Sequence, residues 1–316
     1  MYMGTPDFAV ESLRCLVEGG YNVVGVVTGP DKAVGRHGSV LQPTPVKQYA
    51  VEHGLRVLQP EKLKDEAFIE ELRSLQADLQ IVVAFRMLPE VVWSMPPLGT
   101  FNLHASLLPQ YRGAAPINWA VINGDKETGV TTFFLKHEID TGAVIRQVRV
   151  PISETDCVGD VHDRLMQLGG GVVCETVDAI IDGSAEATPQ EMMMPEGELR
   201  PAPKIFKETC LIDWNRPSKQ VYDFIRGLSP YPAAWTTLVA PDGTETVLKI
   251  YEAVVPEESV LPQSCGAIET DGKSYLYIDN ADGALSIRTL QLAGKKRMGI
   301  GDFLRGSRID DCYRVK

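Results

Sequence analysis

The chain has no hydrophobic run long enough to cross a membrane and no closely spaced pair of cysteines. Its longest apolar runs, such as Ile81 to Phe85, are far shorter than the ~20 residues of a membrane helix. Met1 to Pro6 lack a basic region followed by an apolar one, so we expect no secretory signal and no membrane partner. The six cysteines form no C-x-x-C pair, which excludes zinc ribbons and thioredoxin-type motifs. Scattered thiols of this kind are typical of a reduced, cytoplasmic protein.

The glycine and histidine signatures of common cofactor-dependent enzymes are also missing. No G-x-G-x-x-G follows an expected strand, and there is no G-x-x-x-x-G-K-[ST], H-E-x-x-H or G-x-S-x-G. Gly4-Thr5-Pro6-Asp7 occupies the place of a dinucleotide phosphate loop, and the run Gly169 to Gly171 is expected to end a helix. The five histidines show no metal-ligand spacing. Nicotinamide, P-loop and zinc mechanisms are therefore disfavoured, and we expect no metal.

The fractions of hydrophobic and charged residues are those of an ordinary globular protein. With 316 residues, 44% hydrophobic and 23% charged, the chain has the size of roughly two domains. Its net charge of −11 makes it a poor default binder of nucleic acid. Residues 288–316, however, carry eight basic side chains against three acidic ones. This basic stretch fits a local contact with a polyanion, and it equally fits a solvated surface with ordinary charge scatter.

Strand and helix patterns alternate through the first half of the chain. Apolar, β-branched runs predict strands over 22–28, 79–85, 100–104, 130–137 and 144–150. Apolar residues at helical spacing predict helices over 8–17, 46–53, 62–75, 116–123, 158–168 and 172–181. Strands separated by helices indicate an α/β fold with a Rossmann-like, mostly parallel sheet covered on both faces. Such sheets bind ligands at the carboxyl ends of their strands.

The pattern changes after Asp182. Residues 191–208 are aperiodic and rich in Met and Pro, which predicts a linker crossing the surface. A helix is expected over 218–227, followed by short strands over 235–240, 247–255, 267–269, 274–278 and 285–291. Asp-Gly turns between these strands indicate a small, OB-like antiparallel β-barrel. We therefore expect a catalytic domain over 1–190, a linker over 191–208 and a barrel domain over 209–316.

Three polar residues in the first half could carry chemistry. Asn102 and His104 stand at i and i+2, so on a strand their side chains lie on the same face. An asparagine buried without a partner costs about 1–3 kcal/mol, so the pair is either hydrogen-bonded in the core or a pair of donors aimed beyond the sheet. Asp140 follows the next strand, although an Asp in a D-T-G turn is often only a turn former. Together the three could form an acid–base and oxyanion cluster without a cofactor.

At these residues the chain resembles the 10-formyltetrahydrofolate-dependent formyltransferases. The resemblance spans nearly the whole chain, and within the family it is greatest to the members that act on methionyl-tRNA. The motifs that match in order and spacing are Gly4–Phe8, Pro30–Arg36, Asn102-x-His104, Ser106–Pro109, Arg112–Pro116, Asp140–Gly142, Lys204-x-x-Lys207, Ile212–Trp214 and Ala293–Lys296.

The resemblance implies a reaction and residues for it. A formyl group would move from the co-substrate 10-formyltetrahydrofolate to the amino group of methionyl initiator tRNA, through a tetrahedral intermediate, for translation initiation. Asn102 and protonated His104 match the positions that stabilise the oxyanion, and Asp140 matches the carboxylate paired with the histidine. The folate would lie along Ser106, Leu107, Leu108 and Pro109, with its pterin ring between 84–90 and 136–140.

The resemblance also implies contacts with tRNA, and we expect a monomer. Arg36, in the glycine-containing loop 31–42, matches an arginine that reaches the acceptor end of the tRNA. The remaining candidate phosphate contacts are Lys204, Lys207, Lys295, Lys296 and Arg297. Each lysine of this kind should contribute about one unit to the salt dependence of binding.

Other functions stay open, and two departures from the family pattern stand out. The same site could formylate a sugar amine, hydrolyse formyl-folate with water as acceptor, or belong to a carrier without turnover. Only Met1 to Met3 precede Gly4, where the family has a full first strand, so we expect a late start assignment or a truncated central strand. Ala84 to Pro89 lacks the family's usual Tyr-Gly pair and is one residue short, which leaves details of folate binding open.

Overall fold

The computed structural model describes residues 1–34, 40–195, 197–257 and 262–316, and the chain folds into two compact units. The first unit comprises Met1–Gly113, Thr128–Val150 and His162–Pro201. The second comprises Ala114–Glu127, Pro151–Val161 and Ala202–Lys316. The chain passes between the units more than once, and the boundaries expected at 190 and 208 stay a prediction.

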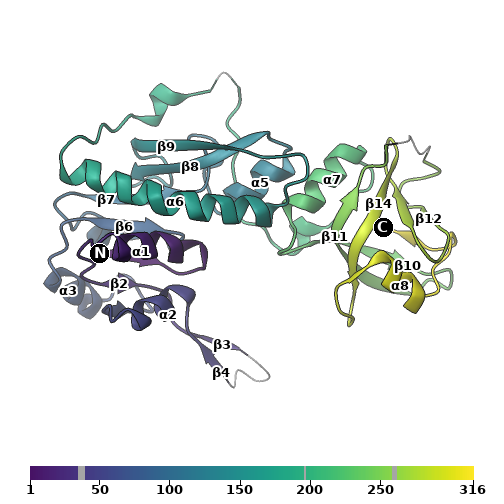
Figure 1. Ribbon diagram of the computed structural model, residues 1–316, viewed down its shortest axis with the longest axis horizontal. Coiled ribbons are helices and arrows are strands. Elements are labelled where there is room, and N and C mark those ends of the chain that lie inside the picture. Colours follow the sequence, from purple (N-terminus) through teal and green to yellow (C-terminus); the bar gives the residue numbers. More distant parts are fainter. Residues whose placement is uncertain (35–39, 196, 258–261) are drawn as a thin grey trace. The chain divides into compact units, whose positions relative to one another are not determined.

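A seven-stranded sheet forms the centre of the first unit (Figure 1). Its order is β5-β2-β1-β6-β7-β8-β9; the pairs from β5 to β7 are parallel, and β8 runs antiparallel to β7. The predicted mostly parallel, Rossmann-like sheet is thereby confirmed. The strands are β1 (Tyr2–Gly4), β2 (Val26–Val27), β5 (Val57–Leu58), β6 (Gln80–Val83), β7 (Thr100–His104), β8 (Glu127–Phe134) and β9 (Val144–Pro151).

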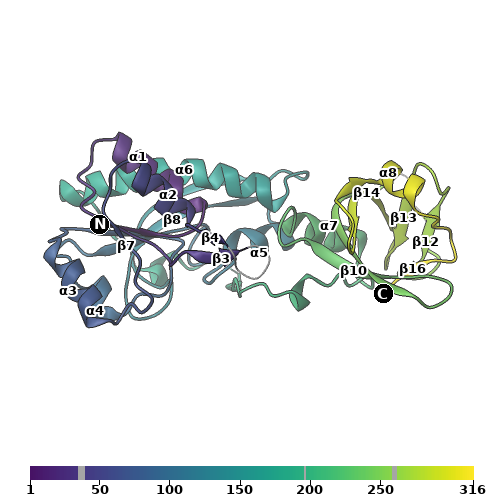
Figure 2. The same cartoon turned by 90° about the horizontal axis from the view of Figure 1, so that it is seen from below.

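Helices cover both faces of this sheet. Successive side chains of each strand point to opposite sides, so apolar strands present a hydrophobic surface on each face that helices bury. Met3 and Val82 pack in one hydrophobic cluster with α3 (Glu66–Ser74) and α4 (Glu90–Trp93). The opposite face carries α1 (Phe8–Glu18) and α6 (Val158–Ile181), and Figure 2 shows these two pairs of helices on opposite sides of the sheet. The helix α2 (Pro45–Glu52) packs beside α1.

The expected helix end at Gly169 to Gly171 is wrong, since α6 runs unbroken for 24 residues. A methyl group on Gly169 would lie 2.7 Å from Cδ2 of Leu103, and one on Gly170 would lie 2.6 Å from Sγ of Cys15. These glycines therefore let α6 approach β7 and α1 closely, and that packing outweighs their weak helix propensity. Among the described residues, no helix combines the length and apolarity that crossing a bilayer requires.

The segment 31–42 was expected to be a loop, but its two ends form a β-hairpin. The strands β3 (Lys32–Val34) and β4 (Val40–Gln42) pair antiparallel. Arg36, the tRNA candidate of this segment, lies outside the described residues. The predicted strand over 22–28 is also shorter than expected, because only Val26–Val27 pairs in the sheet.

The second unit contains the predicted antiparallel barrel. Its strand order is β12-β13-β14-β11-β10-β16, and β15 (Met298–Gly299) pairs with β14. The Val315 N–H donates to the Gly266 carbonyl at 2.8 Å, which brings the last strand back to the first and nearly closes the barrel. The strands are β10 (Ala234–Val239), β11 (Glu245–Val254), β12 (Ile268–Thr270), β13 (Leu276–Asp279), β14 (Ala284–Leu292) and β16 (Arg314–Val315).

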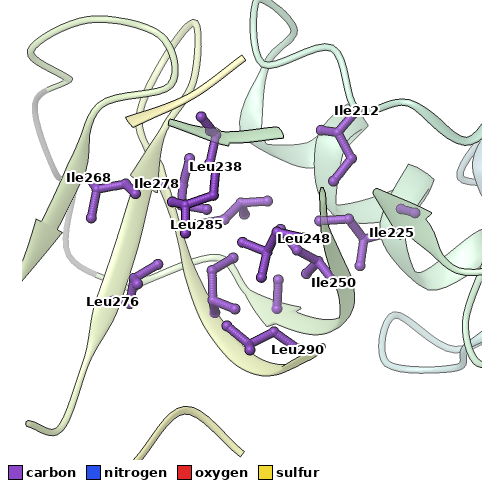
Figure 3. Close-up of a cluster of buried hydrophobic side chains, with 14 of the residues drawn as sticks. Ile212, Ile225, Leu238, Leu248, Ile250, Ile268, Leu276, Ile278, Leu285 and Leu290 are labelled. Atoms are coloured by element: carbon purple, nitrogen blue, oxygen red, sulfur yellow. The ribbon is translucent and has the colours of Figure 1, made fainter. Parts of the chain in front are cut away.

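Branched aliphatic side chains fill the barrel. Figure 3 shows Leu248 and Ile250 of β11 gathered in its interior with Leu285 and Leu290 of β14 and Ile278 of β13. The helices of this unit are α5 (Pro116–Ile122), α7 (Ser218–Gly227) and α8 (Ile300–Gly306), of which α8 was not predicted. Alternation along β10 and β11 leaves their other side chains on the outside of the barrel.

Candidate active site

Asn102 and His104 lie on the same face of β7, as their spacing predicts. The register places Asn102 beside Val82 of β6 and Phe133 of β8, on the sheet face that carries α3 and α4. His104 is buried and Asn102 half-buried. Within the described part of the chain, the Asn102 side chain has no hydrogen-bond partner. A half-buried amide without a protein partner is available to a ligand.

Both ring nitrogens of His104 face oxygen atoms. Nε2 lies 2.8 Å from the carbonyl oxygen of Tyr111, and Nδ1 lies 3.9 Å from Oδ2 of Asp140. Because a carbonyl oxygen only accepts, Nε2 donates a hydrogen bond to Tyr111, whereas the longer distance places Nδ1 facing the carboxylate without a direct hydrogen bond. A reacting group that takes a hydrogen bond from Nε2 has to displace the Tyr111 carbonyl. The structure thus brings the Asp140 carboxylate to His104.

Asp140 reaches His104 because the loop after β8 folds back along the sheet. Phe134, at the end of β8, pairs with Phe101 at the far end of β7 from His104. Asp140 has a left-handed backbone with φ of 54°, which is unfavourable for a residue other than glycine. The Gly113 N–H donates to its Oδ2 at 3.0 Å. This bond orients the carboxylate toward the histidine.

Gln190, for which the sequence predicts no role, lies between these two loops. Its side chain is fully buried, and its Nε2 donates to the carbonyls of Asp140 at 2.9 Å and Gly142 at 2.8 Å. Its Oε1 accepts hydrogen bonds from Nε and Nη2 of Arg112, at 3.0 and 2.6 Å. Gln190 begins the short 3-10 helix Gln190–Met193, next to the segment expected to be a surface linker. No periodic signal marks it in the sequence.

The predicted folate loop is braced from within the protein. Ser106 is buried and its hydroxyl donates to the Gln110 carbonyl at 2.7 Å. Leu108 is also buried; its N–H donates to Thr131 Oγ1 at 3.2 Å, and its carbonyl accepts from Gln147 at 2.9 Å. These side chains hold the loop in shape. That Ser106, Leu107, Leu108 and Pro109 contact folate stays a prediction.

The two segments expected to enclose a pterin ring are joined by a contact between polar side chains. His137 Nε2 lies 3.2 Å from Glu90 Oε1. Large apolar side chains on both segments are exposed, Met87 by 73% and Ile139 by 58%. Such surfaces could cover a flat ring, although the pocket itself stays a prediction. Among the described residues, no three His, Cys, Asp or Glu side chains are arranged to hold a metal ion.

The predicted basic residues that the structure describes lie in the second unit, several of them against aromatic rings. Lys207 Nζ is 5.9 Å from the ring centre of Trp235, and Trp235 Nε1 donates to the Lys207 carbonyl at 2.8 Å. Arg297 lies 4.2 Å from the ring centre of Tyr251. The other three are exposed, and they are Lys204 beside Phe206 and the neighbours Lys295 and Lys296.

Comparison with known proteins agrees with this arrangement. Residues 1–177 match the family described as formyl transferase, and residues 204–308 match the formyl transferase C-terminal domain. The chain therefore belongs to the formyl transferase family, whose members are enzymes.

Individual relatives show which members of the family the chain is similar to. The chain is 71% identical to methionyl-tRNA formyltransferase of Phocaeicola vulgatus, over 100% of this chain and 98% of that protein. It is 70% identical to the methionyl-tRNA formyltransferase of Parabacteroides distasonis, over 100% and 97% of the two chains. The N-formyltransferase from Helicobacter canadensis, solved with folinic acid and dTDP-3-aminofucose, has the same fold with a TM-score of 0.63. It is 19% identical over 94% of this chain and 98% of that one.

Proposed function

We propose that this chain transfers a formyl group from 10-formyltetrahydrofolate to the amino group of methionyl initiator tRNA. The observation that carries the proposal is the approach of Asp140 to His104, with Asn102 on the same face of β7 and without a side-chain partner among the described residues. The identity of about 70% to methionyl-tRNA formyltransferases supports the choice of acceptor.

The reaction needs one charge stabilised and one proton moved. The amine attacks the formyl carbon and a C–N bond forms, while the carbonyl oxygen becomes an oxyanion. The Asn102 amide and the His104 imidazolium are the donors for that oxyanion, and one such donor typically contributes about 10²–10³ in rate. The C–N10 bond of the folate then breaks, and the proton lost by the amine passes to the folate nitrogen. Asp140 faces Nδ1 of the imidazole and orients the ring for these steps.

The tRNA would contact the outside of the barrel and the segment before it. Trp235 pairs in register with Lys249, and Lys249 with Gln291, whose Oε1 accepts a hydrogen bond from Tyr251 at 2.7 Å. Leu248 is buried, so the residues on either side of it along β11 face outward. The two aromatic rings, the cations that lie over them and Lys249 form one face, which we call the basic-aromatic face. It consists of Lys207, Trp235, Lys249, Tyr251 and Arg297.

That face suits a single-stranded or frayed nucleic acid end. Cations neutralise phosphates, and aromatic rings stack with bases in a way that tolerates any sequence. A small sugar amine would have no use for such a face, which is why we favour tRNA as the acceptor. A barrel domain that binds tRNA, a catalytic domain ending near residue 190 and a monomeric enzyme are parts of the same proposal.

The test is formyl transfer from 10-formyltetrahydrofolate to charged initiator methionyl-tRNA. Charged elongator methionyl-tRNA, an amino-sugar nucleotide and a reaction without acceptor run beside it. We expect formylation of the initiator alone. Folate turnover without any acceptor would instead assign a hydrolase, and formylation of the sugar would move the enzyme to another acceptor class.

A further inference from the structure

We infer that Gln190 is a positioning residue for the proposed reaction: it holds the Asp140 loop in the conformation that places the carboxylate beside His104. The inference rests on the proposed function, since it assigns Gln190 an effect that acts through Asp140. The Gln190 side chain is fully buried and its amide bonds to both loops of the site.

The Gln190 amide uses all of its hydrogen-bonding capacity on the two loops of the site. Its two N–H groups bond to the carbonyls of Asp140 and Gly142, which flank Thr141. Its oxygen takes both lone-pair positions to Arg112. A buried amide that is satisfied in this way at four points imposes one geometry on its neighbours, because any shift leaves a buried polar group unpaired.

These bonds form a closed ring through the candidate catalytic group. Gln190 binds the Asp140 backbone, and the Asp140 carboxylate accepts from the Gly113 N–H at 3.0 Å. Gly113 follows Arg112, which returns to Gln190. The ring therefore fixes the backbone of Asp140 and the orientation of its carboxylate together.

The Asp140 loop needs such a support. A left-handed φ of 54° is less favourable for aspartate than for glycine, so contacts from the surroundings help to hold it. The loop is also tight, since a methyl group on Gly142 would lie 1.6 Å from the Phe134 carbonyl oxygen. Without Gln190, we expect the loop to relax and the 3.9 Å approach of Asp140 to His104 to be lost.

The experiment is a double-mutant cycle on kcat with initiator methionyl-tRNA and 10-formyltetrahydrofolate. Gln190→Met keeps the shape and removes the polar bonds, while Gln190→Glu keeps an acceptor for Arg112 and removes the two donors. We expect both to lower kcat by roughly 10–100-fold with KM for either substrate changed little, because an ångström-scale displacement of a catalytic group has effects of that size. Gln80→Met is the matched control, since Gln80 is equally buried but lies on β6.

The cycle separates positioning from general support of the fold. In the Asp140→Asn background, Gln190→Met should cause almost no further loss, since both changes remove the same group from His104. Losses that multiply would overturn the inference, and so would an unchanged kcat in Gln190→Glu when Asp140→Asn is impaired. Full activity of Asp140→Asn would instead overturn the catalytic role of Asp140, and the inference with it. Melting temperatures of all variants show whether the folded state is retained.

Discussion

The candidate active site and the basic-aromatic face are built in opposite ways. In the first unit His104, Gln190 and the Asp140 carboxylate are held by hydrogen bonds to backbone groups of neighbouring loops. On the barrel, Lys207 and Arg297 lie over aromatic rings, and strand pairing together with the Tyr251–Gln291 hydrogen bond connects those rings across the outer face. A site that must hold a proton at a stated atom needs fixed geometry, whereas a surface that meets phosphates needs charge and area.

The largest effect should come from His104→Ala. Removing the imidazole takes away an oxyanion donor and the partner of Asp140, so kcat should fall by about 10²–10⁴. The dissociation constant for tRNA should stay within about twofold, because the barrel face is untouched. Single-turnover rates and filter binding measure the two quantities. A variant that keeps its full rate would indicate a carrier or a different catalytic group.

A smaller loss is expected from Gly142→Ala. The added methyl group meets the Phe134 carbonyl at 1.6 Å, so the loop has to open. We expect the free energy of unfolding to drop by about 1–3 kcal/mol and kcat to fall with it. Gly171→Ala is the control, since its methyl group would meet nothing within 4 Å on α6 and should raise stability slightly. Urea unfolding compares the pair; equal stabilities would contradict a tight loop.

Substitutions on the barrel should change the binding of tRNA. The loss of a cation should change the salt dependence of binding, whereas the loss of an aromatic ring should change the affinity. Lys207→Ala should reduce the slope of log Kd against log salt by about one, because one phosphate contact is lost. Trp235→Ala should weaken tRNA binding by about 1–3 kcal/mol with the slope unchanged, and Trp235→Phe should restore much of it. Lys64→Ala, at an exposed lysine of the first unit, is the control. If Lys64→Ala changed the slope as much as Lys207→Ala, the proposed face would be wrong.

The smallest effect should appear in acid, at a barrel turn. The Ser274 hydroxyl and the backbone N–H groups of Ser274 and Lys273 hold the pKa of Asp271 well below its usual range. Because this pKa is lower in the folded chain than in the unfolded one, the carboxylate stabilises the fold above about pH 4. That contribution is lost as the pH falls further. In Asp271→Asn the melting temperature should therefore fall less steeply with acid than in the original chain. Parallel plots of melting temperature against pH for the two proteins would contradict a stabilising role of the hydrogen bonds to Asp271.

Regular elements with a clear period were predictable from the sequence. The strand over 100–104 and the helix over 218–227 have the predicted bounds, and the barrel strands lie within a few residues of theirs. Periodicity works there because one face of each element is buried. It failed at Gly169 and Gly170, where contacts with Leu103 and Cys15 keep a helix going that local propensity would end.

The sequence by itself determined the mostly parallel sheet and the antiparallel barrel, and it placed Asn102 and His104 on one face of their strand. It also determined that a carboxylate follows the next strand along the chain. Only the tertiary structure decided that Asp140 folds back to His104 and that the Tyr111 carbonyl bonds to the other ring nitrogen. It also decided that Gln190 binds both loops. The physical reason is range. Strand and helix patterns depend on neighbours within a few residues, whereas Gln190 lies 50 residues from Asp140 and 78 from Arg112 along the chain. Hydrogen bonds between such distant segments leave no period in the sequence, and only the folded chain brings their partners together.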